Sequence, residues 1–299
     1  MELSSRPPAA VSSERAPAPS TLAIDIGGTG IKAAVLDSNG RMATARARVV
    51  TTYPMAPEHL IDTVADLVGA FDARGGAPAP ASYHRVSVGF PGVIRDGHVL
   101  TAPHFVTTEG PGTSIDAALA DAWSGFDLAE ALGTRLGRPI RVANDADLQG
   151  GAVVSGQGLE LVVTLGTGVG TGLYWQGRLA PHLELAHHPL AKGQTYDERL
   201  GEAARLRAGN KKWRRRVVRA IDVLYSLLHY DHLFIGGGNS SRLRGHVPDG
   251  VTLVDNAAGI LGGIKLWEQG EPPAAGATRP GPPEPALGRG ARSSPAPGR

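Results

Sequence analysis

The sequence predicts an α/β protein built from two related halves that face a shared crevice. Helical and strand patterns alternate along the chain, and a length of 299 residues suits two domains. Three glycine-rich segments each follow an apolar run typical of strands, namely AIDIGGTGIK (23–32), TLGTGVGTG (164–172) and FIGGGNS (234–240). The pair Asn144 and Asp145 lies between the first two segments, so the pattern indicates a cleft that holds phosphate against a hydroxyl nucleophile.

The first half begins with three strands, expected at 22–26, 31–36 and 43–50. Glycine-containing turns separate these strands, which is typical of an antiparallel meander. Apolar residues at helical spacing predict a helix over 59–71, and a strand follows at 85–90. The stretch 101–125 fits part of a ligand pocket, a lid or a plain surface connection.

The second half is expected to repeat this order. A helix at 127–136 and a strand at 140–143 lead to a helix at 146–154, and the boundary between the halves is expected near residue 143. The remaining expected elements are strands at 161–165 and 172–175, a helix at 217–229, strands at 232–235 and 251–254, and a helix at 257–267.

Composition narrows the class of protein. Residues 1–20 and 270–299 are rich in Pro, Gly, Ala and Arg, which predicts disordered tails around two lobes at 21–143 and 144–269. No apolar run is long enough for a membrane helix and no leader pattern is visible, so we expect a cytoplasmic protein. The absence of cysteine excludes disulfides and cysteine-ligated zinc. The formal net charge of +2 gives no general affinity for polyanions.

The first glycine segment has the composition of a phosphate-binding turn. Gly27 and Gly28 let a ligand approach the backbone, whose N–H groups and the Thr29 hydroxyl would face phosphate oxygens. Asp25 precedes this turn, where Mg²⁺ or its water shell would belong. A plain hairpin with an aspartate in its turn explains this segment equally well when it is considered alone.

Two later segments share this chemistry. Gly166, Thr167, Gly168 and Gly170 form a second turn rich in N–H donors, and two turns can hold one polyanion from opposite walls. The third segment, 236–239, is expected to open a helix, whose N-terminus favours a further phosphate or a nucleotide base.

Asn144 and Asp145 end a short strand and begin a helix, a junction where ligands gather in open α/β sheets. Both residues also cap helices well, so a simple N-cap is the alternative. The flanking phosphate turns favour a carboxylate that accepts the proton of an attacking sugar hydroxyl. Glu184 and His187 are three residues apart and can project to one side of a turn toward neighbouring hydroxyls, whereas His188 is equally well a surface residue.

Together these segments resemble the ROK family of sugar kinases, over nearly everything between the tails. The resemblance is carried by DIGGTGIK (25–32), VGFPGVIRDG (88–97), VANDADLQGG (142–151), TLGTGVGTGL (164–173), ELAHHPLAKGQTYDERLG (184–201), KKWRRRV (211–217), DHLFIGGGNSSRL (231–243) and NAAGILGGIKLW (256–267). It implies an actin-like ATPase domain fold, similar to ribonuclease H, with two lobes of mixed sheets flanked by helices. It also implies a homodimer that phosphorylates the 6-hydroxyl of glucose with Mg²⁺.

The resemblance also implies a role for each candidate site residue. Asp145 would be the general base. The expected hexose contacts are Asn144, Glu184, His187 and either Asp197 or Glu198. The expected phosphate and magnesium site contains Asp25, Gly27, Gly28, Thr29, Gly30, Lys32, Gly166, Thr167 and Gly168. The expected site for adenosine or a second phosphate contains Gly236, Gly237, Gly238 and Asn239.

Typical members of the family carry a cysteine-rich zinc motif where this chain has KGQTYDERLG (192–201). No structural zinc is therefore expected, and the difference points to the branch that uses inorganic polyphosphate, with ATP as an alternative donor. Ala186, where that branch has glycine, and Thr29, where serine is commoner, are small departures. The runner-up is an ATP-dependent kinase of glucose, mannose or an N-acetylated hexose, and a non-catalytic sugar sensor or regulator is a remote alternative.

The strongest local charge cluster consists of Lys211, Lys212, Arg214, Arg215 and Arg216. A solvated helix face explains it as well as a track for a long polyphosphate chain does, since such a chain would release counterions on binding as nucleic acid does. Nucleic acid itself is not an expected partner, because no nucleic-acid module accompanies the cluster.

Overall fold

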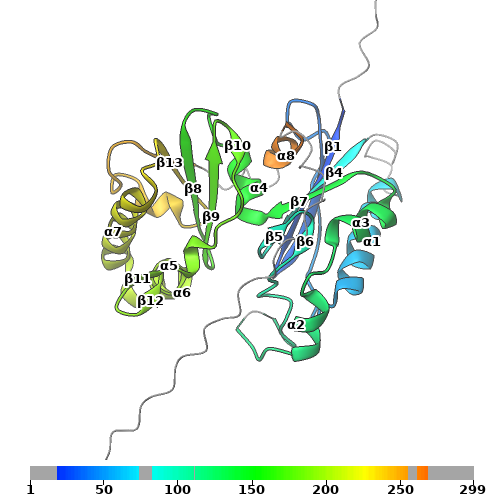
Figure 1. Ribbon diagram of the computed structural model, residues 1–299, viewed down its shortest axis with the longest axis horizontal. Coiled ribbons are helices and arrows are strands. Elements are labelled where there is room, and N and C mark those ends of the chain that lie inside the picture. The colour runs from blue at the N-terminus through cyan, green and yellow to red at the C-terminus, as the bar shows by residue number, and fades with distance from the viewer. Residues whose placement is uncertain (1–18, 74–82, 111, 255–260, 269–299) are drawn as a thin grey trace, which may run out of the picture.

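The computed structural model describes residues 19–73, 83–110, 112–254 and 261–268. They form two lobes side by side, each built on a five-stranded sheet with helices packed on it (Figure 1). Within these ranges no helix is long and apolar enough to cross a membrane. Nearly all of the predicted tails, 1–20 and 270–299, lies outside the described residues.

The first sheet has the strand order β3-β2-β1-β4-β7. Its strands are β1 (Thr21–Gly27), β2 (Gly30–Leu36), β3 (Ala47–Val49), β4 (Arg85–Phe90) and β7 (Ile140–Asn144). The first three form the predicted antiparallel meander, while β4 and β7 run parallel to β1. The predicted strand 43–50 is shorter, because the Thr44 hydroxyl oxygen accepts the Val35 N–H that a partner strand would otherwise take.

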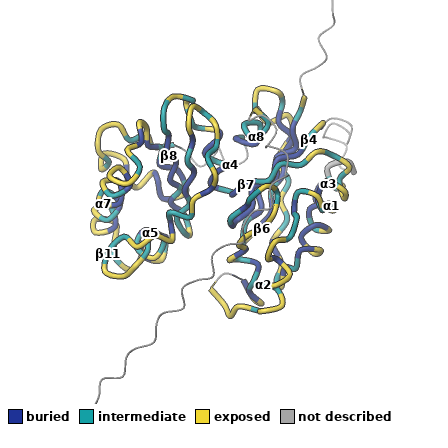
Figure 2. The backbone as a smooth tube through the Cα atoms, in the orientation of Figure 1, coloured by how far each residue is buried: buried dark blue, intermediate teal, exposed yellow. Residues whose placement is uncertain are grey.

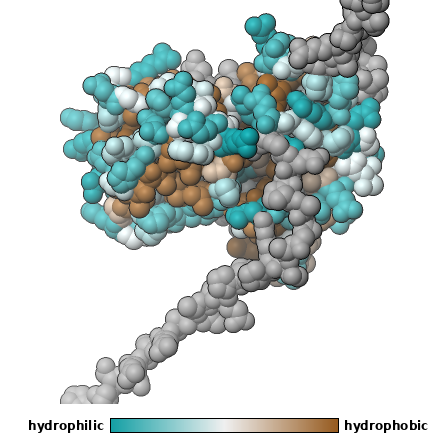
Figure 3. All heavy atoms as spheres, turned by 45° about the horizontal axis from the view of Figure 1, so that its top comes forward, coloured by the Kyte–Doolittle hydropathy of each residue, from teal (hydrophilic) through white to brown (hydrophobic). Residues whose placement is uncertain are grey.

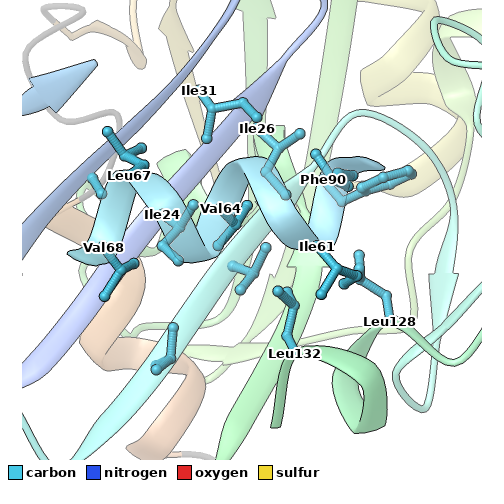
Figure 4. Close-up of a cluster of buried hydrophobic side chains, with 14 of the residues drawn as sticks. Ile24, Ile26, Ile31, Ile61, Val64, Leu67, Val68, Phe90, Leu128 and Leu132 are labelled. Atoms are coloured by element: carbon cyan, nitrogen blue, oxygen red, sulfur yellow. The ribbon is translucent and has the colours of Figure 1, made fainter. Parts of the chain in front are cut away.

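Helices α1 (Pro57–Ala73) and α3 (Leu128–Leu136) belong to the core of this lobe (Figure 4). Val64 of α1 and Leu132 of α3 are fully buried in one cluster with Ile24 of β1. Burying an aliphatic side chain of this size contributes about 1.5–3 kcal/mol. The apolar residues whose helical spacing predicted α1 thus form the stripe that packs on the sheet and holds its strands.

The second sheet repeats the design with the order β10-β9-β8-β13-β14. Its strands are β8 (Leu159–Leu165), β9 (Val169–Trp175), β10 (Arg178–Leu179), β13 (His232–Gly236) and β14 (Val251–Leu253). An antiparallel meander again adjoins two strands parallel to β8. Two mixed sheets flanked by helices confirm the predicted fold class.

The long helix α7 (Asn210–Leu228) packs on the second sheet through Trp213, Val217 and Leu224. The indole N–H of Trp213 donates a hydrogen bond to the Leu200 carbonyl at 2.7 Å. The sequence predicts this helix only from residue 217. It begins earlier because Trp213 extends the apolar stripe by a turn and the Lys and Arg residues around it are good helix formers.

The lobe of the second sheet exposes large apolar side chains. They are Trp175, Leu183, Leu206, Tyr225 and Leu227. Figure 3 shows a hydrophobic area, in brown, on one face of this lobe. Exposed apolar surface of this kind is typical of contact with another protein surface.

The lobes meet at the short helix α4 (Asp145–Gly151), which follows β7 without a break (Figure 2). Gly170 of β9 allows this helix to lie close, because a Cβ atom there would come within 2.7 Å of the Ala146 Cβ. On the other side, a Cβ atom at Gly89 of β4 would come within 3.3 Å of the Asp145 Cα. The start of α4 is therefore held against both lobes.

After β14 the chain returns to the first lobe as η5 (Leu261–Ile264), a 3-10 helix, and α8 (Lys265–Glu268). Ser87 Oγ donates to the Gly263 carbonyl at 2.6 Å and accepts a bond from Trp267 Nε1 at 2.8 Å. The predicted helix 257–267 is thus a 3-10 turn and a short helix in its second part, and residues 255–260 lie outside the described ranges.

Shorter elements that the sequence did not indicate complete the chain. They are β5 (Ile94–Arg95), β6 (His98–Val99), α2 (Ala117–Trp123), η2 (Leu185–His187), β11 (Pro189–Ala191), β12 (Gln194–Thr195), α5 (Tyr196–Leu200) and α6 (Glu202–Ala208), whereas the 3-10 helix η3 (Ser240–Leu243) stands where a full helix was predicted. Most are too short to show a periodic pattern, which is why sequence reasoning missed them.

Candidate active site

The first glycine segment is the tight turn between β1 and β2. Three side chains from the following segment donate hydrogen bonds to its three consecutive carbonyl groups: Thr51 Oγ1 to Gly27, Tyr53 OH to Gly28 and Arg48 Nη2 to Thr29, at 2.7, 2.7 and 3.4 Å. With its carbonyl groups bonded to the protein, the turn is held in one conformation. A preformed turn of this kind suits a phosphate ligand, because its N–H groups need no rearrangement.

A row of charged side chains crosses the sheet beside this turn. Asp25 of β1 lies opposite Lys32 of β2, and Lys32 lies opposite Arg48 of β3, so all three project from one face. Lys32 Nζ is 3.0 Å from Asp25 Oδ2. The Arg48 side chain lies over Gly30, where an added Cβ would come within 2.8 Å of Arg48 Nε.

Sequence reasoning missed Arg48. The residue is exposed, and its guanidinium group lies at the first glycine turn on the face that carries Asp25. Its alternation with Val49 was consistent with a strand, but only the register between β2 and β3 shows that it stands next to Lys32. The site therefore has two cationic side chains at this turn, where the sequence predicted only Lys32.

Asn144 and Asp145 stand at the start of α4. Asn144 Oδ1 accepts the Ala146 N–H at 2.8 Å, as the N-cap alternative predicted, and its Nδ2 donates to the Gly92 carbonyl at 3.0 Å. Asp145 is partly exposed. Burial and, next, the negative charge of Asp25 raise the pKa of Asp145 to about 7. The structure thus brings Asp25 and Asp145 together across the junction of β1 and α4.

A carboxyl group with this pKa is suited to proton transfer near neutral pH. It is largely ionised in slightly basic solution and still basic enough to take a proton from an alcohol. Most acidic side chains at a protein surface titrate about three units lower. The raised pKa therefore makes Asp145 a candidate for proton transfer.

The second glycine segment joins β8 to β9 and lies against α5. Asp197 Oδ1 accepts the Val169 N–H at 2.7 Å and sits beneath Gly168, where a Cβ atom would come within 2.5 Å of it. Glu198 forms a capping box with Thr195 at the start of α5. Asp197, rather than Glu198, therefore faces the glycine turn.

His104 connects the segment 101–125 to this part of the cleft. Burial lowers the pKa of His104, and the negative charge of Asp197 opposes that shift. His104 belongs to the first lobe and Asp197 to the second, so this part of 101–125 lies on the side of the first lobe that faces the second.

The third glycine segment packs directly on the second. Gly237 has a left-handed backbone (φ 84°), and its Cα lies so close to Leu165 that a side chain would not fit. The Asn239 N–H donates to the Leu165 carbonyl at 2.9 Å. The sequence predicts a helix after this segment, whereas the structure has only the 3-10 turn η3, so the favourable N-terminus of a full helix is missing here.

The Asn239 side chain is buried in a polar network. Its Nδ2 donates to Glu202 Oε2 at 2.8 Å, and its Oδ1 accepts a bond from Arg242 Nε at 3.2 Å. Glu202 in turn pairs with Arg205, whose bond, followed by that of Asn239, lowers the pKa of Glu202 to about 2. The network holds the second and third glycine segments together, a role that the sequence did not indicate.

Glu184 and His187 lie at either end of the 3-10 turn η2, with His187 Nδ1 3.9 Å from Glu184 Oε2. The Glu184 side chain is about one-third exposed and that of His187 largely exposed. Behind them lies His182, which sequence reasoning missed. Its Nδ1 is 2.8 Å from Asp147 Oδ2, and its Nε2 is 3.6 Å from Glu184 Oε1.

The basic cluster does not join this site. Figure 1 shows α7 on the side of the second lobe that faces away from the first. Arg214 donates to the Arg242 carbonyl at 2.7 Å, and Arg216 Nη1 donates to the Arg199 carbonyl at 3.3 Å. Lys211, Lys212 and Arg215 are exposed and project into solvent.

Comparison with known proteins places this chain in a family. The model of the ROK family matches residues 21–183. The polyphosphate glucokinase of Mycobacterium tuberculosis is 29% identical over 257 residues, which cover 80% of this chain and 88% of that protein. The crystal structure of an inorganic polyphosphate/ATP-glucomannokinase from Arthrobacter sp. strain KM superposes with a TM-score of 0.68 at 32% identity, over 84% of this chain and 99% of that one.

A ROK family glucokinase from Streptomyces griseus, in complex with glucose and AMPPNP, superposes with a TM-score of 0.65 at 20% identity, over 84% of this chain and all of that one. This likeness bears on the fold alone. The chain belongs to the ROK family of sugar kinases, as its motifs indicated. Its fold is the two-lobed actin-like ATPase fold that the resemblance implied.

Proposed function

We propose that this protein transfers a phosphoryl group from inorganic polyphosphate, with ATP as an alternative donor, to the 6-hydroxyl of glucose. The observation that carries the proposal is the position of Asp145. This carboxyl group has a pKa raised to about 7, stands at the junction of the two lobes and lies beside the phosphate turn that follows Asp25. A general base next to a phosphate site is what phosphorylation of an alcohol requires.

In the proposed reaction Asp145 accepts the proton of the 6-hydroxyl while that oxygen attacks the terminal phosphorus of the donor. The bond from phosphorus to the bridging oxygen breaks, and the shortened donor leaves with the electron pair. The hexose is held by Glu184 and His187 on η2, by Asp197 below the second glycine turn, and by Asn144. Such positioning, with charge neutralisation, supplies most of the acceleration in phosphoryl transfer.

The donor is assigned to the glycine turns. N–H groups of the first two turns, the Thr29 hydroxyl and the cations Lys32 and Arg48 bind its terminal phosphates. The segment Gly236 to Asn239 forms the site for adenosine or a further phosphate, through its backbone, because the Asn239 side chain is bonded within the protein. Cations at these positions offset the charge of the transferring group.

Magnesium fits the donor set at this place. Asp25 and Asp145 are like charges whose repulsion contributes to the raised pKa of Asp145, and a divalent cation would relieve it. Among the described residues no three His, Asp or Glu side chains form a metal site by themselves. Mg²⁺ would therefore be held by Asp25 together with water and donor phosphates, and when bound it would neutralise phosphate charge.

We also propose that the exposed cations Lys211, Lys212 and Arg215 of α7 bind distant phosphates of a long polyphosphate chain. All three are exposed and lie within the first six residues of one helix. Arg214 and Arg216 hold this part of α7 to neighbouring segments. A homodimer formed through the exposed apolar surface of the second lobe completes the proposal, and light scattering would measure it.

Activity on a panel of acceptors and donors tests the proposal. Purified protein with Mg²⁺ is incubated with glucose, mannose or an N-acetylated hexose, each with polyphosphate or ATP. Glucose 6-phosphate formed from polyphosphate supports it. Mannose belongs in the panel because the similar Arthrobacter protein is a glucomannokinase. Activity with ATP alone would favour the ATP-dependent hexokinase, and no product from any pair would favour a non-catalytic sugar sensor.

A further inference from the structure

A chain of three ionisable side chains runs from the helix between the lobes to the proposed sugar site. Asp147 belongs to α4 and is 2% exposed. Its Oδ2 is 2.8 Å from His182 Nδ1, and His182 Nε2 is 3.6 Å from Glu184 Oε1. The His182 side chain is only 5% exposed, whereas that of Glu184 is 32% exposed. The chain thus links a fully buried carboxylate to one that can touch a ligand.

His182 lies in this chain as an imidazolium cation. A neutral imidazole has one N–H and no net charge, whereas here the two ring nitrogens lie 2.8 and 3.6 Å from carboxylate oxygens, which favours the doubly protonated ring. Burial alone would lower the pKa of His182, yet its bonds to Asp147 and Glu184 raise it to about 9. The bond with His182 lowers the pKa of Glu184 in turn, so Glu184 is a carboxylate.

The positive charge of His182 stabilises the buried carboxylate of Asp147. Burial raises its pKa, and among the described residues its Oδ1 has no hydrogen-bond partner. The Tyr174 hydroxyl donates to the Asp147 carbonyl group, which fixes the backbone at this residue. Because an uncompensated buried carboxylate is costly, the imidazolium ring is held firmly at Asp147 and can serve as a rigid link.

We propose that His182 is a positioning residue for the sugar site: it ties the carboxylate of Glu184 to the helix that begins with the base Asp145. The proposal rests on the proposed function, since it takes Glu184 as a hexose contact. Asp147 is two residues after Asp145 on α4. The link through His182 therefore holds the Glu184 carboxylate in a fixed position relative to the base Asp145. The backbone beside it is tied to β9, where Thr171 Oγ1 donates to the Leu183 carbonyl at 3.0 Å.

Two substitutions separate the two ends of the link. In His182→Asn the side-chain amide reaches about as far as Nδ1, so the bond to Asp147 is kept and the contact with Glu184 is lost. In His182→Gln the amide reaches about as far as Nε2, so the contact with Glu184 is kept. Since each change breaks the link at one end, we expect both variants to raise the KM for glucose, His182→Asn roughly tenfold, with kcat and the donor KM little changed.

A double variant that also carries Glu184→Gln shows whether the effect of His182 on glucose binding passes through Glu184. If His182 acts through Glu184, adding His182→Asn to Glu184→Gln should raise the glucose KM little further, because coupled changes are not additive. Thermal unfolding and circular dichroism check that each variant is folded. Should His182→Asn fail to fold, His182→Gln alone and in the Glu184→Gln background gives the same comparison.

Glucose affinity is also measured by calorimetry, without turnover, so the outcome does not depend on the donor. A folded His182→Asn variant with the wild-type glucose affinity would overturn the inference. An equal rise in the glucose and donor KM values would also overturn it, because it would indicate a general structural effect. A wild-type protein that binds glucose but phosphorylates no hexose would refute the proposed function and leave the affinity test of His182 standing.

Discussion

The carboxylate of Asp25, on the first strand, faces that of Asp145, at the start of the helix between the lobes. The negative charge of Asp25, after burial, is the second cause of the raised pKa of Asp145. Asp25 is itself paired with Lys32 at 3.0 Å. The site therefore contains two carboxylates with different properties. Asp25 is partly neutralised by Lys32 and suits a cation, whereas Asp145 suits proton transfer.

Asparagine at position 145 should remove the proton acceptor and keep the shape of the side chain. We expect turnover of Asp145→Asn to fall by roughly 10²–10⁴-fold, while calorimetry shows little change in glucose affinity. Asp121→Asn, on the exposed side of α2, is the matched control. Turnover of the Asp145→Asn variant close to that of the wild type would show that another group takes the proton.

The activity should depend on pH through Asp145. The base works only when it is deprotonated, and its pKa is raised to about 7, so kcat/KM should rise with pH through this value and level off above it. Below it, each pH unit should lower kcat/KM about tenfold. The measurement is a pH profile at saturating Mg²⁺, with unfolding checked at each pH. A profile that is flat across the neutral range would contradict the assignment.

Arg48 should affect the donor and not the sugar. Its guanidinium group lies at the phosphate turn, so Arg48→Gln should raise the donor KM roughly tenfold and leave the glucose KM unchanged. Arg41→Gln is the matched control, because Arg41 is exposed in the same connection outside the paired strands. Equal donor KM values for the two variants would remove Arg48 from the donor site.

The exposed cations of α7 should matter for long donors only. We expect the triple replacement of Lys211, Lys212 and Arg215 by glutamine to weaken long polyphosphate more than ATP. The dependence of polyphosphate affinity on salt should also become shallower, because fewer counterions are released. Kinetics with both donors over a range of salt concentrations measure this. Equal effects on the two donors would identify the cluster as an ordinary solvated helix face.

The parts of the fold and site that the sequence predicted are encoded by residues that follow one another in the chain. A turn that must admit phosphate to the backbone requires glycines, as at Gly27 and Gly28, and a buried strand that ends at a polar helix start appears directly at Asp145. The sheets followed from alternating patterns of the same local kind.

The parts that it did not predict depend on register and on contacts far apart in the chain. Arg48 reaches the phosphate turn only through the pairing that sets it opposite Lys32. His182 acquires its place from Asp147, 35 residues earlier. The break at Thr44 arises from one hydroxyl that replaces a strand partner. The spacing of apolar residues along the chain carries no information about such contacts.

The return of the chain to the first lobe has a mechanical consequence. The polypeptide passes between lobes once where β7 runs into α4, and again between β14 and the segment that Ser87 and Trp267 fasten to the first sheet. The two lobes are therefore joined covalently at two places along the chain, and neither lobe hangs on a single linker.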